Sequence, residues 1–129
     1  MIVLDTHTWI WLVSEPQRLS KAVIAADAKV LSSISAWEVA TKVTQNKLIL
    51  DRPVLDWVVA AHAEHDVRSE PISMQIAIRA GILGAEGFHG DPADRIIVAT
   101  ALLLRCPLAT TDEKIRNWAA GRNDLSIVW

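Results

Sequence analysis

Short apolar runs alternate with longer segments of helical periodicity along the chain, and this alternation limits the possible folds more than any other feature of the sequence. Strands separated by helices pair in parallel, because each helix carries the chain back across the sheet. No repeat or linker interrupts the pattern, so we expect one α/β domain over residues 1–129 around a mainly parallel sheet. The expected strands are residues 2–5, 29–34, 67–73, 107–111 and 125–129.

Helices are expected between these strands, and two of their starts show capping chemistry. The stretch from Ser35 to Glu38 matches a capping box, with Ser35 as N-cap and Glu38 at the third helical position. Asp91 before Pro92 is the usual arrangement of an N-cap followed by proline. The expected helices start near residues 6, 20 and 35 and span 53–64, 74–84, 92–105 and 112–119.

The charge balance is nearly even, with 13 Lys and Arg against 15 Asp and Glu and a formal net charge of −2. A globally basic nucleic-acid binder is therefore excluded, and any recognition of phosphate must be local or mediated by a metal ion. The one cysteine, Cys106, favours a reducing, cytoplasmic location. Asp5 and His7 interrupt the apolar start, which is expected to form a strand and a helix rather than to cross a membrane.

Six tryptophans are many for 129 residues, and their large area predicts that most lie in the core. Trp9 and Trp11 are two positions apart on an expected helix and cannot share one face. Either one of them is exposed for a partner, or that helix is packed on two sides.

Four acidic residues stand where strands give way to helices. Asp5 ends the first strand, Glu38 lies one turn into the helix after the second, Asp94 lies in the first turn of helix 92–105, and Asp112 follows the fourth strand. Right-handed crossovers start their helices at the carboxyl edge of a parallel sheet, where ligands bind in such folds. The four carboxylates can therefore converge from distant parts of the chain.

Each acid also has a structural explanation, because carboxylates are favoured in the first turn of a helix. Glu38 fits the capping box and precedes Lys42 by one helical turn, and Asp112 can cap the helix that follows it. Asp91 is explained by capping alone. Asp94 is less easily explained, since the positions three, four and seven residues further on are apolar and share its helix face.

Convergence of these acids would have a strong electrostatic consequence. Two carboxylates about 5 Å apart repel by roughly 3 kcal/mol at an effective dielectric constant of 20. Four of them would hold protons or a cation, and oxygen ligands select Mg²⁺ or Mn²⁺ over zinc. Such an ion can activate water and neutralise charge on a phosphoryl group.

Four segments, in this order and in a chain of this length, resemble motifs of the PIN-domain ribonucleases, and most of all those of the VapC toxins of bacterial type II toxin–antitoxin pairs. They are IVLDTHTWIWLV (2–13), SAWEVATK (35–42), DPADRIIVATAL (91–102) and PLATTDEKI (107–115). The resemblance implies a Rossmann-like α/β/α sandwich and a Mg²⁺-dependent endoribonuclease, with Mn²⁺ as a substitute. It also implies inhibition by a VapB-type antitoxin, and dimers, which are common in the family.

The resemblance also implies roles for single residues. It gives the metal-binding acids as Asp5, Glu38, Asp94 and Asp112. Thr110 matches a threonine that supports the acidic cluster, and Asp91 matches the DP of this subgroup, which adds an outer position at the site to its capping role. Thr111 departs from the basic residue of many relatives, which leaves open how RNA phosphate is gripped. Three basic residues can meet phosphates, with a solvated surface charge as the alternative: Arg95, Lys42 and Arg116.

Two rival functions remain open from the sequence. One is a metal-dependent phosphohydrolase or phospho-acceptor domain with Asp5 as nucleophile, although the chain has DTH there and not Asp-x-Asp. The other is a non-catalytic module that binds RNA or protein and keeps the acids for its fold. His7 and His89 can also reach the edge of the site, but single histidines are more often structural.

Overall fold

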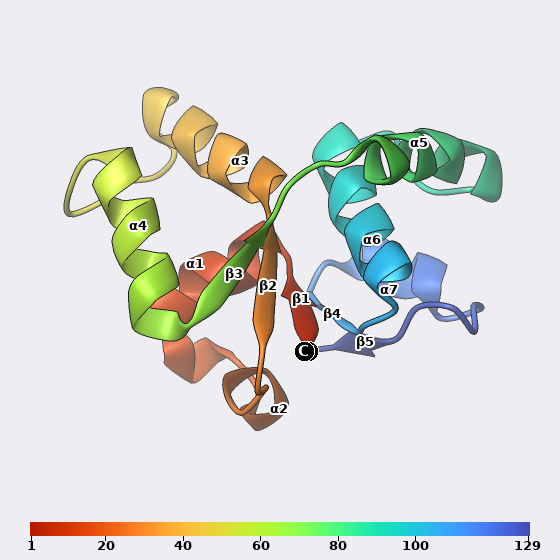
Figure 1. Cartoon of the computed structure of the whole chain (residues 1–129), viewed down its shortest axis with the longest axis horizontal. Helices are drawn as coiled ribbons and strands as arrows, with labels where there is room; N and C mark the ends of the chain where they lie inside the picture. The colour runs from red at the N-terminus through yellow and green to blue at the C-terminus, as the bar shows by residue number, and fades with distance from the viewer.

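The predicted strands form one five-stranded sheet in the computed structural model, which describes all residues, 1–129 (Figure 1). All neighbouring strands pair in parallel, as predicted. In spatial order the strands are β3 (Val67–Glu70), β2 (Lys29–Ser32), β1 (Ile2–Leu4), β4 (Leu108–Ala109) and β5 (Ile127–Val128).

Helices connect the strands close to the predicted positions. The largest difference is the helix expected from residue 20, which is a single turn because the chain must enter β2 at Lys29. The α-helices are α1 (Thr6–Ser14), α2 (Lys21–Ile24), α3 (Ser33–Thr44), α4 (Val54–His65), α5 (Met74–Ile82), α6 (Pro92–Leu104) and α7 (Glu113–Ala119), and the 3₁₀ helices are η1 (Pro16–Arg18) and η2 (Leu83–Glu86). None of these helices is both long and apolar enough to span a membrane.

Two apolar cores lie on the opposite faces of the sheet. Side chains alternate along β1, so that Ile2 and Leu4 belong to the core beneath α1–α4, while Val3 belongs to the core beneath α5–α7. Figure 1 shows the first group of helices on one side of the sheet and the second group on the other. This is the three-layer α/β/α sandwich that the resemblance implied.

The prediction that most tryptophans lie in the core is wrong. Trp9 is fully buried against Trp57, with ring centroids 5.0 Å apart, but Trp37 and Trp129 are 60% and 56% exposed. The strands are only two to four residues long, and the cores they cover hold few side chains as large as an indole. Trp11 is half-buried at the edge of a cleft.

The strand order reverses between β1 and β4. The chain passes outward from β1 to β2 and β3, and then returns over the other face through α5 and α6 to β4. Asp5 follows β1 and hydrogen-bonds through its amide to the carbonyl of Ala109, the last residue of β4 (3.0 Å). Ligands of open α/β sheets bind at such a reversal, outside the carboxyl ends of the strands.

Candidate active site

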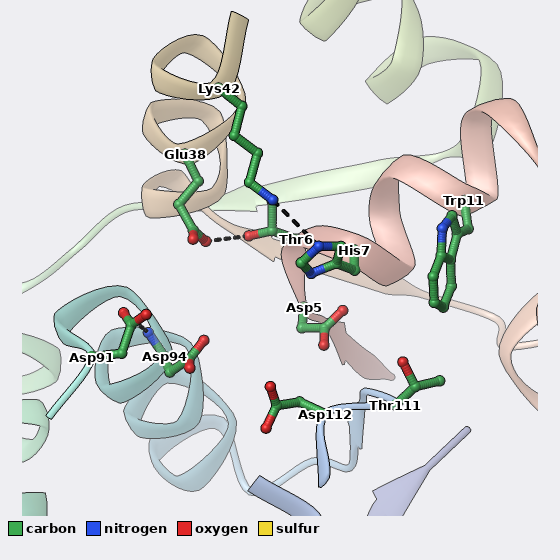
Figure 2. Close-up of a pocket in the computed structure, with 10 residues that line it drawn as sticks. All are labelled: Asp5, Thr6, His7, Trp11, Glu38, Lys42, Asp91, Asp94, Thr111 and Asp112. Atoms are coloured by element: carbon green, nitrogen blue, oxygen red, sulfur yellow. Dashed lines mark hydrogen bonds between the residues drawn. The ribbon is translucent and has the colours of Figure 1, made fainter. Parts of the chain in front are cut away.

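A polar cleft of about 470 Å³ opens at this reversal (Figure 2). All four predicted acids line it, together with the capping aspartate of α6. The five carboxylates are Asp5, Glu38, Asp91, Asp94 and Asp112. They come from β1, α3, the start of α6 and the start of α7, so that the convergence predicted from the sequence is present.

Asp5 is the most firmly held of the five carboxylates. It is buried and caps α1, where its Oδ1 accepts a hydrogen bond from the amide of Thr8 (2.7 Å). Its Oδ2 accepts from the hydroxyl of Thr110, which itself accepts from the amide of Asp112 (3.0 Å). Thr110 thus ties the end of β1 to the residues that follow β4.

The start of α3 differs from the predicted capping box. The N-cap is Ser32, whose Oγ accepts a hydrogen bond from the amide of Ile34 (3.3 Å), and the helix begins at Ser33. Glu38 is therefore the sixth helical residue, where it cannot cap the first turn. The prediction failed because the helix begins two residues earlier than Ser35, directly after the last paired residue of β2.

Ser35 and Glu38 instead face Thr6 of α1. The Thr6 hydroxyl donates to Glu38 Oε1 (2.5 Å) and also contacts Ser35 Oγ (2.8 Å). Ser35 and Thr6 are buried, so this contact fixes the position of Glu38 relative to Asp5, the residue before Thr6. Nothing in the sequence spacing indicated it, since the partners are 29 and 32 residues apart.

Asp91 and Asp94 divide the start of α6 between them. Asp91 is the N-cap, as predicted, and its Oδ1 accepts from the amides of Ala93 (2.9 Å) and Asp94 (3.3 Å). The Asp94 carboxylate caps nothing. Its Oδ2 accepts a hydrogen bond from Nε2 of His89 (2.7 Å). His89 was only an open candidate from the sequence, and the structure places it directly behind Asp94.

The loop that carries His89 is clamped by Arg95. The guanidinium of Arg95 donates to the carbonyl oxygens of His89 (2.8 Å) and Phe88 (3.3 Å). The Phe88 ring is buried and stacks on the His89 ring, with centroids 4.2 Å apart. Arg95 is therefore a structural residue of this loop and does not line the cleft.

A second set of contacts holds the same loop at Glu86. The Glu86 carboxylate pairs with Arg79 of α5 and with Arg122, which follows α7. Its carbonyl oxygen accepts from Nε1 of Trp118 (2.9 Å). The loop from η2 to α6 is thus anchored at both ends.

Of the three basic residues that the sequence left open as phosphate contacts or surface charges, only Lys42 lines the cleft. Its Nζ lies 3.3 Å from Nε2 of His7 (Figure 2). Arg95 is engaged with loop carbonyls, as described above. The guanidinium of Arg116 covers the ring of Trp129, 3.8 Å from its centroid, away from the carboxylates.

Crowding and burial perturb two of the acids. Burial raises the pKa of the Glu38 carboxyl, and repulsion from Asp94 and Asp91 adds to this, against the hydrogen bond from Thr6, which lowers it. Burial likewise raises the pKa of Asp94, with repulsion from Asp91 and Asp112 opposed by the bond from His89. A positive ion bound in the cleft would therefore stabilise the charged form of both carboxyl groups.

The donor chemistry of the cleft fits a hard divalent cation. Every acidic donor offers oxygen, and neither cysteine nor paired histidines lie among the lining residues, so zinc is a poor match. Each oxygen of Asp5 accepts one hydrogen bond and keeps a second lone pair for a metal. The carboxylates line the cleft but do not form a preformed metal site. No three acidic, histidine or cysteine side chains lie together in a group that could hold a metal ion.

Comparison with known proteins agrees with this geometry. The PIN-domain family model matches residues 2–121. Ribonuclease VapC22 of Mycobacterium tuberculosis is 39% identical over 120 residues, which are 90% of each chain. A toxin–antitoxin complex from Klebsiella pneumoniae shares the fold with a TM-score of 0.70 and 24% identity, over 97% of this chain and 95% of that one. DNA-bound VapBC from Salmonella typhimurium does so with a TM-score of 0.68 and 20% identity, over 98% and 95%. The chain therefore belongs to the PIN-domain family, among the relatives of the VapC ribonucleases.

Proposed function

We propose that the chain is an endoribonuclease that hydrolyses RNA phosphodiester bonds with the help of Mg²⁺, for which Mn²⁺ can substitute. The observation that carries this proposal is the convergence of Asp5, Glu38, Asp94 and Asp112 on one cleft from four separate elements. Such a set of oxygen donors suits Mg²⁺ and repels polyanions unless a cation is bound. The name of the relative VapC22, a ribonuclease, supports RNA as the substrate.

The metal ion, when bound, would lower the pKa of a coordinated water and neutralise charge on the attacked phosphate. The chain supplies ligands whose orientation is already set by their neighbours. Thr8 and Thr110 orient Asp5, Thr6 orients Glu38, and His89 orients Asp94. Outer hydrogen bonds of this kind fix carboxylate ligands and are typically worth 10–100-fold in metal affinity or activity. Asp112 is the fourth acid of the set.

The hydrogen bonds of Asp5 argue against the rival phosphohydrolase. An aspartate that attacks phosphorus needs an oxygen that can approach the substrate in line, and hydrogen bonds that fix and partly neutralise its charge make it a weaker nucleophile. Both oxygens of Asp5 accept hydrogen bonds, and the side chain is buried. These features suit a fixed metal ligand better than a nucleophile.

The test is cleavage of total cellular RNA by the purified chain, freed of any bound partner. Discrete fragments are expected with Mg²⁺ or Mn²⁺, and intact RNA is expected with EDTA. A folded, partner-free chain that leaves RNA intact with every metal would contradict the proposal. Hydrolysis of p-nitrophenyl phosphate in the same preparations would then favour the phosphohydrolase, and inactivity in both assays would favour the non-catalytic module.

We further propose that the chain is the toxin of a cytoplasmic pair neutralised by a VapB-type antitoxin. The support is the fold shared with toxin–antitoxin complexes, including VapBC of Salmonella typhimurium. A partner tail that packs on apolar side chains at the surface of the chain and extends a basic side chain toward the carboxylates would block the cleft. Neutralisation predicts that RNA cleavage stops when the antitoxin is added back to the stripped toxin.

We also propose a homodimer, supported by an apolar stripe on α5. Met74, Ile78 and Ile82 recur every fourth residue and are 77%, 58% and 50% exposed, while Ile76 and Ala80 on the other face are buried in the core. Ile78→Lys is expected to convert a dimer into a monomer with unchanged circular dichroism. Sedimentation equilibrium checks this, and a wild-type chain that is monomeric at tens of micromolar would contradict it.

A further inference from the structure

Lys42 reaches into the cleft without an ion pair. It lies one helical turn after Glu38, a spacing that commonly gives an ion pair, but its ammonium pairs with no carboxylate in the structure. Its Nζ instead lies 3.3 Å from Nε2 of His7. Because an ammonium can only donate, Nε2 of His7 accepts this hydrogen bond. His7 thus holds the ammonium in place, and Lys42 offers an anion a full positive charge.

Trp11 is the one hydrophobic residue in the lining of this polar cleft. The guanidinium of Arg18 covers its ring, 4.0 Å from the centroid, and the His7 ring lies 6.2 Å away, tilted by 53°. Arg18, whose charge is paired with Glu15 (3.5 Å), thereby holds the indole from one face. We call His7, Trp11 and Lys42 the basic–aromatic wall. In Figure 2, Trp11 and His7 lie on one side of Asp5, Asp91 and Asp94 lie on the other, and Lys42 reaches toward His7 from the helix that also carries Glu38.

The two sides of the cleft have complementary chemistry for a nucleotide chain. The carboxylates can act on one phosphate only through a cation, and they repel the neighbouring phosphates. The chain has a net charge of −2, so attraction of the polyanion must be local. An ammonium binds phosphate oxygens, and an indole stacks on a base whose faces are not covered by neighbouring bases.

We propose that the basic–aromatic wall is the substrate subsite beside the scissile phosphate. Lys42, held in place by Nε2 of His7, binds the oxygens of an adjacent phosphate, and the indole of Trp11 stacks on the base of that nucleotide. The substrate is accordingly an unpaired RNA segment, because a base stacked within a duplex cannot present its face to Trp11. This inference rests on the proposed ribonuclease function and specifies its substrate class.

Binding is measured first, in the uncleaving Asp94→Asn chain with Mg²⁺ and a fluorescein-labelled single-stranded RNA. Trp11→Leu is expected to weaken binding about tenfold, the loss of one stacked base, while Trp11→Phe keeps most of the affinity. Lys42→Gln is expected to lower the slope of log affinity against log salt by about 0.7, the value for one phosphate contact on a single strand. The same RNA segment enclosed in a hairpin stem should bind weakly, and Trp11→Leu should not weaken its binding further.

Two control variants test whether the losses are specific to the basic–aromatic wall or follow from removing any lysine or any exposed tryptophan. Lys47→Gln removes an exposed lysine just beyond α3, and Trp129→Leu removes an exposed tryptophan outside the cleft. Neither should change the affinity or the salt slope. In the cleaving chain, Trp11→Leu should raise KM about tenfold and leave kcat within about twofold, as expected for loss of uniform binding.

Different results would contradict the basic–aromatic wall and the proposed ribonuclease function. RNA left intact by the wild-type chain overturns the function itself. If the wild-type chain cleaves RNA but Lys42→Gln and Trp11→Leu match it in affinity, salt slope and KM, the wall is no RNA subsite and a protein partner is the better occupant. Should Trp11→Leu fail to fold by circular dichroism, the salt slope of Lys42→Gln decides alone, since Lys42 contacts only the side chain of His7 by hydrogen bond.

Discussion

Replacing Asp94 by asparagine is expected to slow RNA cleavage about a thousandfold, whereas Asp91→Asn is expected to retain most of the activity. A metal ion contributes several kcal/mol of charge stabilisation, and each 1.4 kcal/mol is a factor of ten in rate. Asp94 offers its carboxylate to the cleft and caps nothing, so asparagine would remove one of the proposed metal ligands. Asp91 is the N-cap of α6, a position that asparagine fills equally well.

The comparison is informative because the two substitutions remove the same charge from the same helical turn. Single-turnover cleavage of a defined RNA measures the rates, and urea unfolding checks that both variants fold with at least the wild-type stability. Expression in a bacterial host should arrest growth for the wild type and Asp91→Asn and not for Asp94→Asn. Equal loss of activity in the two variants would show that Asp91 also holds the metal, and full activity of Asp94→Asn would remove Asp94 from the site.

Divalent metal is expected to stabilise the fold strongly at pH 7.5 and progressively less as the pH falls toward 4. The folded pKa values of Glu38 and Asp94 are raised by burial and then by neighbouring carboxylates. Stability from a group with a raised folded pKa is complete below its unfolded pKa and is lost as the pH rises through the folded value. The metal-free chain at neutral pH is therefore weakened by these two groups, and a bound cation relieves the repulsion.

Thermal unfolding measures this effect. A metal concentration a hundredfold above its Kd adds about 2.7 kcal/mol, which raises Tm by roughly 10 °C for a chain of this size. Glu38→Gln with Asp94→Asn should be more stable than the wild type in EDTA at pH 7.5, with a difference that shrinks toward pH 4. It should also show little stabilisation by Mn²⁺. An equal Mn²⁺ shift in the double variant would place the ion elsewhere on the protein.

The sheet and the four acids were predictable because both follow from local rules. Each strand is a short apolar run, and Asp5 and Asp112 follow strands that pair in parallel, so this pairing brings them to one edge whatever the loops do. Asp94 stands in the first turn of a helix, a position that the sequence pattern also indicates. The N-caps Asp91 and Asp112 were also predictable, since each satisfies amides within three residues along the chain.

The contacts between distant segments were not predictable in this way. Three serines precede Glu38 within six residues, each able to cap a helix, and only the pairing of Ser32 with β3 decides where β2 ends. Arg95 follows Asp94 directly, but one residue is a rotation of about 100° on a helix, and its guanidinium meets the loop rather than the cleft. The position of His89 was not predictable either, because it depends on the path of that loop.

The two halves of the cleft differ in how easily substitutions can move their carboxylates, because one half depends on the loop anchored by Arg79, Arg122 and Trp118. Asp5 and Asp112 are set by the strands, so altering their position would mean altering the sheet. The placement of His89 and Asp94 depends on a surface connection held by a few side chains. Substitutions in this connection, for example at Arg79 or Arg122, can therefore change the activity although neither residue lines the cleft. Such variants would still fold normally.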